Sequence, residues 1–309
     1  MVGISSAGIG SGLDIEGIIS SLMAAERIPL TKVSQERTAI NTKISIYGII
    51  KNSFADLKSA ADKLSNLSNL NPLKVTSSDD KQVAATASAT AAKGTYSIQV
   101  SQLAKAQSVA ASSVATADTT VGTGSLTITL GSYDSGSNTF TNNADKTPVT
   151  INIGTGQQTL EGIRQAINDS NAGVNASIIN DGNGSRLVLT SKDTGAVNGF
   201  KLEVADADGN NTDTAGLSRL AFDPTAAVGA GKNASSLQVA QNANFTINNL
   251  AVSKASNTVT DAVQGLTLNL KAVTTTAVNL EVGLDDTALK KNLDDFVAAY
   301  NKIRGNLKD

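Results

Sequence analysis

Both ends of this 309-residue chain carry apolar residues at the spacing of a coiled coil, with a strand-like pattern between them. In the segment that begins at Asp286, the apolar positions are separated by four, three, four, three and four residues. This spacing predicts a helix that packs along a seam against another helix. The pattern is still in phase where the sequence stops, which suggests a fragment of a longer bundle. Its residues are Leu289, Leu293, Phe296, Tyr300, Ile303 and Leu307.

The N-terminal segment predicts a second amphipathic helix, beginning near Asp14, a residue that caps helix N-termini well. Its apolar residues recur at i, i+3, i+4, i+7 and i+8, which form one broad helical face. Pro29 is expected to end or kink this helix, and it could open the next one. Residues 1–12 are rich in Gly and Ser and are expected to be flexible. The apolar face consists of Ile15, Ile18, Ile19, Leu22 and Met23.

The apolar stripe continues from Leu30 to residue 64, where a helix would be roughly 52 Å long at about 1.5 Å per residue. After Tyr47 the stripe takes two consecutive steps of three residues, which resembles a stammer in a heptad pattern. We therefore expect the partner of this helix to change near residues 47–50, with the intermolecular contacts concentrated before residue 50. The stripe runs through Leu30, Val33, Arg37, Ile40, Ile44 and Tyr47, and then Ile50, Phe54, Leu57, Ala61 and Leu64.

Between residues 72 and 284 the pattern changes to alternation of apolar and polar residues, which predicts half-buried antiparallel strands. One short helix is expected at 159–169, with Thr159 as its cap and Leu160, Ile163 and Ile167 facing inward. The alternating positions are residues 96, 98 and 100; 126, 128 and 130; 149, 151 and 153; 200, 202 and 204; 266, 268 and 270; and 278, 280 and 282.

Two low-complexity stretches, 104–124 and 226–236, read as paired connectors around a central block. The predicted fold class is therefore α+β and multidomain: terminal helices form a coiled-coil or helical-bundle leg, and two β-rich antiparallel head domains follow, one inserted in the other. The predicted parts are a flexible segment with an amphipathic leg helix (1–40), an incomplete helical bundle (41–75 plus 284–309), a head domain (76–118 plus 235–283) and an inserted head domain with one short helix (119–234).

Composition argues against an enzyme. The chain contains no His and no Cys, and therefore lacks the commonest general base, the thiol nucleophile and the ligands of most zinc sites. We expect no cofactor and no bound metal.

The charge and hydropathy of the chain exclude further classes of partner. A net charge of −2 predicts no binding to nucleic acid. The absence of a long apolar run predicts no insertion into a membrane. Asp14 and Glu16 lie where a signal peptide would have its apolar core, so no cleaved signal is expected.

Three polar motifs have simpler explanations than catalysis. The Gly-rich run from Gly8 to Gly12 lacks the preceding strand and the Gly-Lys-Ser/Thr ending of a phosphate-binding loop. The segment from Asp206 to Asn210 lacks the glycine position and the final glutamate of a calcium loop, so a surface turn is favoured. Asp285 and Asp286 are placed to cap the last helix.

The residues resemble a known family at three places. The opening Ile4-Ser-Ser-Ala-Gly-Ile-Gly-Ser-Gly-Leu-Asp-Ile-Glu-Gly-Ile-Ile, with Leu22-Met-Ala-Ala-Glu-Arg, resembles the family of flagellar hook-associated protein 2, the filament cap proteins. Asn257-Thr-Val-Thr-Asp-Ala-Val-Gln-Gly-Leu-Thr-Leu-Asn-Leu resembles the second signature of this family. Residues 151–191 resemble a repeat shared by flagellin and hook-associated proteins.

The resemblance implies a cap at the tip of the bacterial flagellum that retains exported flagellin and promotes its folding and polymerisation. It implies a ring-shaped homo-oligomer, typically a pentamer, exported by a type III route without a cleaved signal. The implied partners are flagellin, the hook–filament junction proteins and an export chaperone that binds the C-terminal region missing here. The expected contact residues are Ile15, Ile18, Ile19, Leu22, Met23, Val33, Ile40, Ile44, Tyr47, Leu289, Leu293, Phe296, Tyr300 and Ile303.

Two alternatives stay open from the sequence. Another flagellar axial protein, hook-associated or flagellin-like, would share the paired terminal helices but not the N-terminal signature. A surface adhesin that binds host glycans would need an aromatic-lined site, and the chain has only 6 Phe and 4 Tyr.

Overall fold

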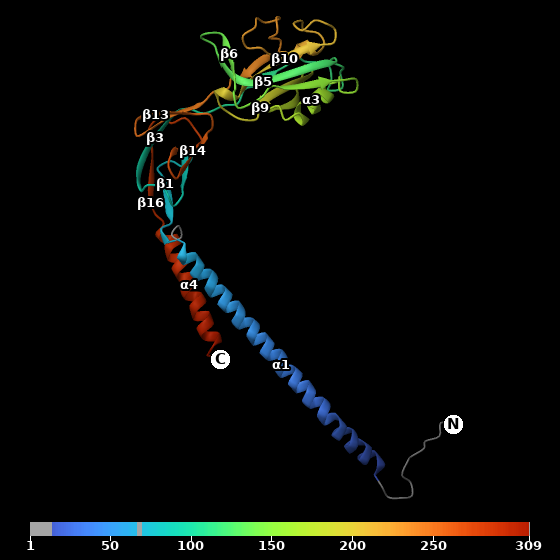
Figure 1. The fold of residues 1–309 in the computed structure, drawn as a ribbon, viewed down its shortest axis with the longest axis vertical. Helices are drawn as coiled ribbons and strands as arrows, with labels where there is room; N and C mark the ends of the chain where they lie inside the picture. The colour runs from blue at the N-terminus through green and yellow to red at the C-terminus, as the bar shows by residue number, and fades with distance from the viewer. Residues whose placement is uncertain (1–13, 67–69, 309) are drawn as a thin grey trace, which may run out of the picture. The chain divides into compact units, whose positions relative to one another are not determined.

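The computed structural model describes residues 14–66 and 70–308, which fall into two compact units. The helical unit comprises residues 1–72 and 285–309, and the β unit comprises residues 73–284 (Figure 1). The expected flexible segment 1–12 and the Gly-rich run at 8–12 lie outside the described residues.

The first helix of the helical unit is 51 residues long, α1 (Ile15–Ser65). Asp14 caps it, because its carboxylate accepts the backbone N–H of Gly17 at 2.8 Å. The expectation that the helix ends at Pro29 is wrong, because α1 continues through this residue. A proline removes a single backbone hydrogen bond from the helix, and the turns on either side of Pro29 keep theirs.

The second helix, α4 (Asp286–Asn306), runs antiparallel to α1. Asp285 caps it by accepting the N–H of Ala288 at 3.1 Å, as the sequence predicts. Three polar contacts give the direction, because residues further along α4 meet residues earlier in α1. These pairs are Asp295 with Lys63, Lys302 with Asp56, and Asn306 with Ser53.

The first and last strands of the β unit lie side by side in one sheet, with Leu73 opposite Leu284. That five-stranded sheet has the order β1 (Leu73–Ser77), β16 (Val278–Leu284), β3 (Gly94–Gln102), β12 (Ala243–Ile247), β13 (Leu250–Lys254). A three-stranded sheet, β14 (Thr258–Val263), β15 (Leu266–Leu270), β2 (Val83–Ala87), contributes to the same hydrophobic core. We call this core, built from residues 83–104 and 243–282, the framing core.

The chain between Ala104 and Ala243 builds a second hydrophobic core, which we call the inserted core (residues 109–234). One of its sheets joins β10 (Gly199–Asp206), β5 (Gly124–Asp134) and β6 (Thr139–Asn142), with β7 (Val149–Ile153) also paired to β5. The other has the order β11 (Ser235–Gln238), β4 (Ser108–Ala110), β9 (Ser185–Ser191), β8 (Val174–Asn180). One α-helix, α3 (Leu160–Asp169), and two short 3₁₀ helices, η1 (Ala196–Asn198) and η2 (Leu217–Leu220), complete it.

The six predicted alternating segments are confirmed as β3, β5, β7, β10, β15 and β16. The two low-complexity stretches are not simple connectors: β4 lies within the first, β11 begins in the second, and the two strands pair with each other. Val109, Ala110 and Ala111 are buried in the β unit. Their small side chains allow neighbouring layers to pack closely at this strand. The low-complexity composition of these stretches gave no sign that they pack into the fold as strands. The boundaries of the four predicted parts stay a prediction.

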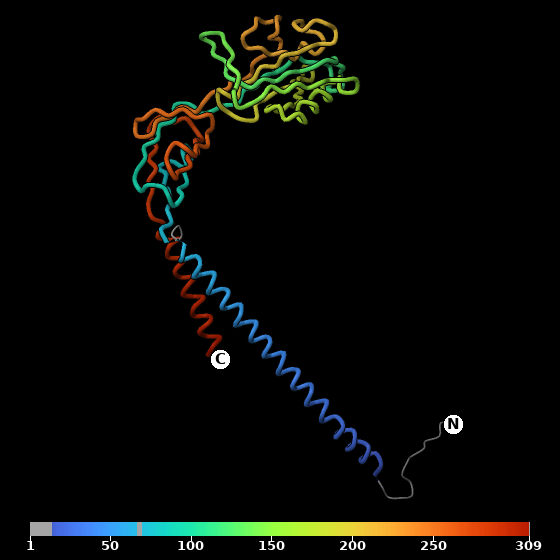
Figure 2. The backbone as a smooth tube through the Cα atoms, viewed as in Figure 1, coloured from blue at the N-terminus to red at the C-terminus, as the bar shows by residue number. Residues whose placement is uncertain are grey.

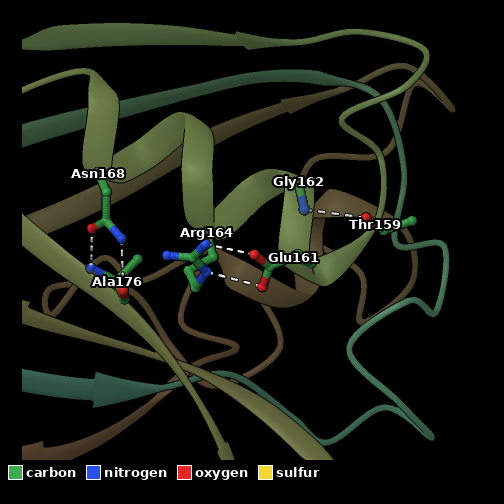
Figure 3. Close-up of polar contacts among 6 residues, drawn as sticks. All are labelled: Thr159, Glu161, Gly162, Arg164, Asn168 and Ala176. Atoms are coloured by element: carbon green, nitrogen blue, oxygen red, sulfur yellow. Dashed lines mark hydrogen bonds and ion pairs between the residues drawn. The ribbon is translucent and has the colours of Figure 1, made fainter. Parts of the chain in front are cut away.

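Helix α3 covers the edge strand β8 through a side-chain amide (Figure 3). The side-chain oxygen Oδ1 of Asn168 accepts a hydrogen bond from the backbone N–H of Ala176 at 2.7 Å, and Nδ2 of Asn168 donates one to the backbone carbonyl of Ala176 at 2.9 Å. This amide replaces the partner that an edge strand lacks. Thr159 caps α3, accepting the N–H of Gly162 at 3.1 Å, and Leu160, Ile163 and Ile167 are buried, as predicted. The Arg164 guanidinium lowers the pKa of Glu161, mainly by hydrogen bonding.

Replacing Asn168 with Ala is expected to destabilise the β unit by about 1–3 kcal/mol, because it leaves two backbone groups of Ala176 without partners. Urea unfolding measures the change. Asn175→Ala is the matched control, since Asn175 is exposed on the same strand. Equal losses in the two variants would contradict the edge-covering role.

Candidate functional site

The helical unit contains one covered seam, where α4 lies against the C-terminal part of α1. On α1 the covered positions are separated by three, four, three and four residues, and Ser53 and Ala60 are buried. On α4, Ile303 is the buried residue, at 5% exposure. The remaining positions are half-buried: Ile50, Leu57 and Leu64 on α1, and Leu289, Asn292, Phe296, Ala299 and Asn306 on α4.

A polar pair lies inside this seam. The Ser53 hydroxyl donates to the carbonyl of Ile49 at 2.9 Å and accepts a hydrogen bond from Asn306 Nδ2 at 2.8 Å. Because a shift along the helix would separate these groups in a buried position, the pair favours one register of α1 on α4.

Ion pairs flank the seam but contribute little to its stability. Lys302 Nζ lies 2.8 Å from Asp56, and both side chains are more than half exposed. The pKa of Asp295 is lowered, first by the hydrogen bond from Lys291 and then by the positive charges of Lys291 and Lys63. The apolar and small residues therefore account for most of the pairing.

The predicted C-terminal stripe divides between two faces of α4. Leu289, Phe296 and Ile303 lie in the covered seam, whereas Leu293, Tyr300 and Leu307 are exposed. On α1 the same division separates covered Ile50, Leu57 and Leu64 from exposed Tyr47 and Phe54. In an antiparallel pair, the equivalent flanks of the two helices face the same side. The two exposed rows therefore form one apolar face next to the seam.

The part of α1 before Ile50 has no covering helix within the described residues. Ile15 is half-buried, and every other predicted contact residue of this segment is more than half exposed. A run of uncovered apolar side chains of this length makes the segment a candidate interaction surface. We call residues 15–49 the open segment of α1; the predicted contact residues exposed on it are Ile18, Ile19, Leu22, Met23, Val33, Ile40, Ile44 and Tyr47.

Near residues 47–50, where two steps of three residues follow one another, the apolar stripe and the positions that α4 covers lie on different faces of α1. Helix α4 covers α1 only from about Ile50 onward, and the covered positions lie on a different flank from the stripe that ends at Tyr47. Sequence reasoning missed Ser53, Ala60, Asn292, Ala299 and Asn306, since small and polar residues carry no hydrophobic signal. The available clue was their spacing of three or four residues from apolar seam positions: Leu57 for Ser53 and Ala60, Phe296 for Asn292, and Ile303 for Ala299 and Asn306.

The acidic segment at Asp206 has hydrogen bonds that stabilise a turn. The Asp206–Asn210 segment forms a surface turn, in which the Asp208 carboxylate accepts the backbone N–H of Asn210 at 2.8 Å; the Asp206 carboxylate accepts the N–H of Ser218 at 3.0 Å. Among residues 14–66 and 70–308, no three acidic, His or Cys side chains gather as metal ligands. In the same ranges no helix combines the length and the apolar character needed to cross a bilayer.

Comparison with known proteins assigns the family. Residues 11–107 match the model of the flagellar hook-associated protein 2 N-terminus, and residues 240–309 match that of its C-terminus. Residues 139–193 match the flagellin hook IN motif, which here forms β6 to β9 with α3. The chain belongs to the flagellar hook-associated protein 2 family.

Relatives of this family align over nearly the whole chain. Flagellar hook-associated protein 2 of Escherichia coli K12 is 37% identical over 98% of the chain, and the chain spans 61% of that relative's length. The D1-D2-D3 domains of the Escherichia coli flagellar cap protein FliD match with a TM-score of 0.72 and 34% identity, covering 85% of this chain and 69% of that one. FliD from Pseudomonas aeruginosa PAO1 matches with a TM-score of 0.57 and 36% identity, covering 73% and 94%.

Truncating Ile303 to Ala is expected to destabilise the helical unit by about 2–4 kcal/mol, because it opens a cavity in the covered seam. Leu293→Ala, which removes an apolar side chain 47% exposed on the same helix, is expected to cost clearly less. Thermal unfolding followed by the helical circular dichroism signal compares them. A larger loss from Leu293→Ala would show that the seam lies on the other face.

Proposed function

We propose that this protein is a filament cap at the distal end of the bacterial flagellum, where it retains exported flagellin and promotes its folding and polymerisation. The observation that carries the proposal is the open segment of α1, a long apolar helical surface in a chain of the flagellar hook-associated protein 2 family. A protein with such a surface acts by contact, and no catalytic step is part of the proposal.

The proposed assembly is a ring of identical subunits, pentameric as is typical for the family. The β-rich domains would form the plate that blocks escape of flagellin, and the helical unit would form the leg. Uncovered apolar helices suit a leg because they gain stability only when a neighbour covers them.

The proposed contact residues fall into two groups. On α1, Ile15, Ile18, Ile19, Leu22, Met23, Val33, Ile40, Ile44 and Tyr47 would contact neighbouring helices. On α4, Leu293 and Tyr300 would contact another helix, whereas Leu289, Phe296 and Ile303 face α1. Flagellin and the hook–filament junction proteins are the proposed partners outside the ring.

The proposed location is the outer tip of the flagellum, reached by type III export without a cleaved signal. A chain without Cys suits passage in unfolded form, since no disulfide could hold it folded. An export chaperone is a further proposed partner.

Deleting the gene is expected to give cells that release unpolymerised flagellin into the medium and carry hooks without filaments. The physical reason is that exported subunits would leave the tip before they fold into the filament. Immunoblots of the medium and electron microscopy of the cells measure this. Filaments of normal length in the deletion strain would rule out the cap function.

Within the full-length protein, Ile44→Asp is expected to abolish filament growth, because a charge would have to be desolvated in the proposed helix contact. Ser45→Asp is the matched control, since it adds the same charge one residue away on a different flank of α1. Swimming motility and filament counts are the readouts. Equal effects of the two substitutions, or normal filaments with Ile44→Asp, would contradict a contact at this face.

A further inference from the structure

The framing core and the inserted core are connected by two short crossings of the chain, residues 103–107 and 239–242. The crossings pair with each other as an antiparallel bridge: the N–H of Lys105 donates to the Gln241 carbonyl at 2.9 Å, and the N–H of Gln241 donates to the Lys105 carbonyl at 3.1 Å. Figure 2 lets the reader follow both crossings within the β unit. A two-stranded bridge by itself would leave the cores free to bend and twist about it.

Side-chain amides attach the crossings to each core. Asn257 of the framing core accepts the N–H of Ala104 at 2.7 Å and donates to the Ala104 carbonyl at 2.9 Å. Gln107 does the same for the inserted core: it accepts the N–H of Phe200 at 3.0 Å and donates to the Phe200 carbonyl at 2.8 Å. Gln107 is buried, so these bonds are shielded from water.

A third contact lies beside the two crossings. The loop 192–198, between β9 and β10 of the inserted core, touches the segment that follows β13 in the framing core. The Thr194 hydroxyl donates to the Ala255 carbonyl at 2.7 Å. The N–H of Ala196 donates to the side-chain oxygen of Asn242 at 2.8 Å, and the N–H of Gly195 donates to the Lys105 carbonyl at 3.2 Å.

Gly195 makes this approach possible. Its φ of +102° is a conformation that residues with a side chain rarely adopt. A Cβ built on Gly195 would overlap Ala255, whose Cα would lie only 2.6 Å away. The loop therefore fits against the framing core only without a side chain at this position.

We propose that the 192–198 loop is a docking contact that holds the inserted core in one orientation relative to the framing core, and that it depends on Gly195. The two crossings define an axis, and a contact to one side of that axis opposes rotation about it. Because the contact consists of a few hydrogen bonds and one close backbone approach, single substitutions are expected to release it without unfolding either core. The inference does not depend on the cap function and is tested on the chain alone.

The test measures the distance between the two cores in the whole chain. The sequence contains no Cys, so two introduced cysteines accept spin labels specifically. They are Val228→Cys, on the surface of the part built around the inserted core, and Leu250→Cys, on the surface of the part built around the framing core. Both side chains are strongly exposed, at 86% and 71%. Double electron–electron resonance then gives the distance distribution between the labels.

In this background, Gly195→Ala is expected to widen the distribution by about twofold or more, because docked domains gain freedom when their contact is lost. Gly182→Ala is the matched control: its φ is +87° and an added Cβ meets no atom within 4 Å. The control is expected to keep the narrow distribution of the parent chain. Thr194→Val combined with Asn242→Ala, which removes two of the bonds without adding bulk, is expected to widen it as Gly195→Ala does.

A broad distribution in the parent chain would overturn the proposal. So would a narrow distribution in both Gly195→Ala and the Thr194→Val/Asn242→Ala variant. Circular dichroism reports whether each variant is folded; if Gly195→Ala does not fold, the double variant alone decides. Equal widening by Gly182→Ala would show that backbone strain rather than docking controls the width, and would also overturn it.

Discussion

The pairing of β1 with β16 is the constraint on which the rest of the β unit depends. It brings Leu73 and Leu284, the first and last residues of the unit, to opposite positions in one sheet. Everything between them must leave and return, so the inserted core is reached by two crossings that run side by side. The pairing closes a loop of about 200 residues, and burial of the framing core offsets the chain entropy that this closure costs.

The helical unit obeys a different rule, because its covered seam is built as much from small residues as from large ones. Ser53 and Ala60 are the buried positions of α1, and Ile303 is the buried position of α4. Small side chains let two helices approach closely, and the larger apolar residues then flank the contact or remain exposed. An arrangement that leaves Phe54, Tyr300 and the open segment of α1 uncovered is suited to further association with other helices.

Elements whose residues repeat with a local period were predicted correctly. Elements whose conformation depends on contacts with distant segments of the chain were not. The alternation at residues 126, 128 and 130 predicted β5, and Thr159 with Ile163 and Ile167 predicted α3, because burial of one face imposes a local period. Of the outcomes expected at Pro29, the end of the helix is wrong, because the long helix α1 loses only one backbone hydrogen bond there. The strands β4 and β11 were missed because their Ala- and Ser-rich sequence resembles a linker.

The sequence by itself determined the class of fold, the helical ends, six of the strands and the family, since these depend on periodicity and on local motifs. Only the tertiary structure decided which half of each apolar stripe is covered, which side-chain amides connect the two cores and why position 195 requires glycine. These features depend on residues far apart in the chain, such as Ser53 with Asn306 and Thr194 with Ala255. A heptad pattern gives an apolar face but not the angle at which a partner meets it, and that angle is set by packing.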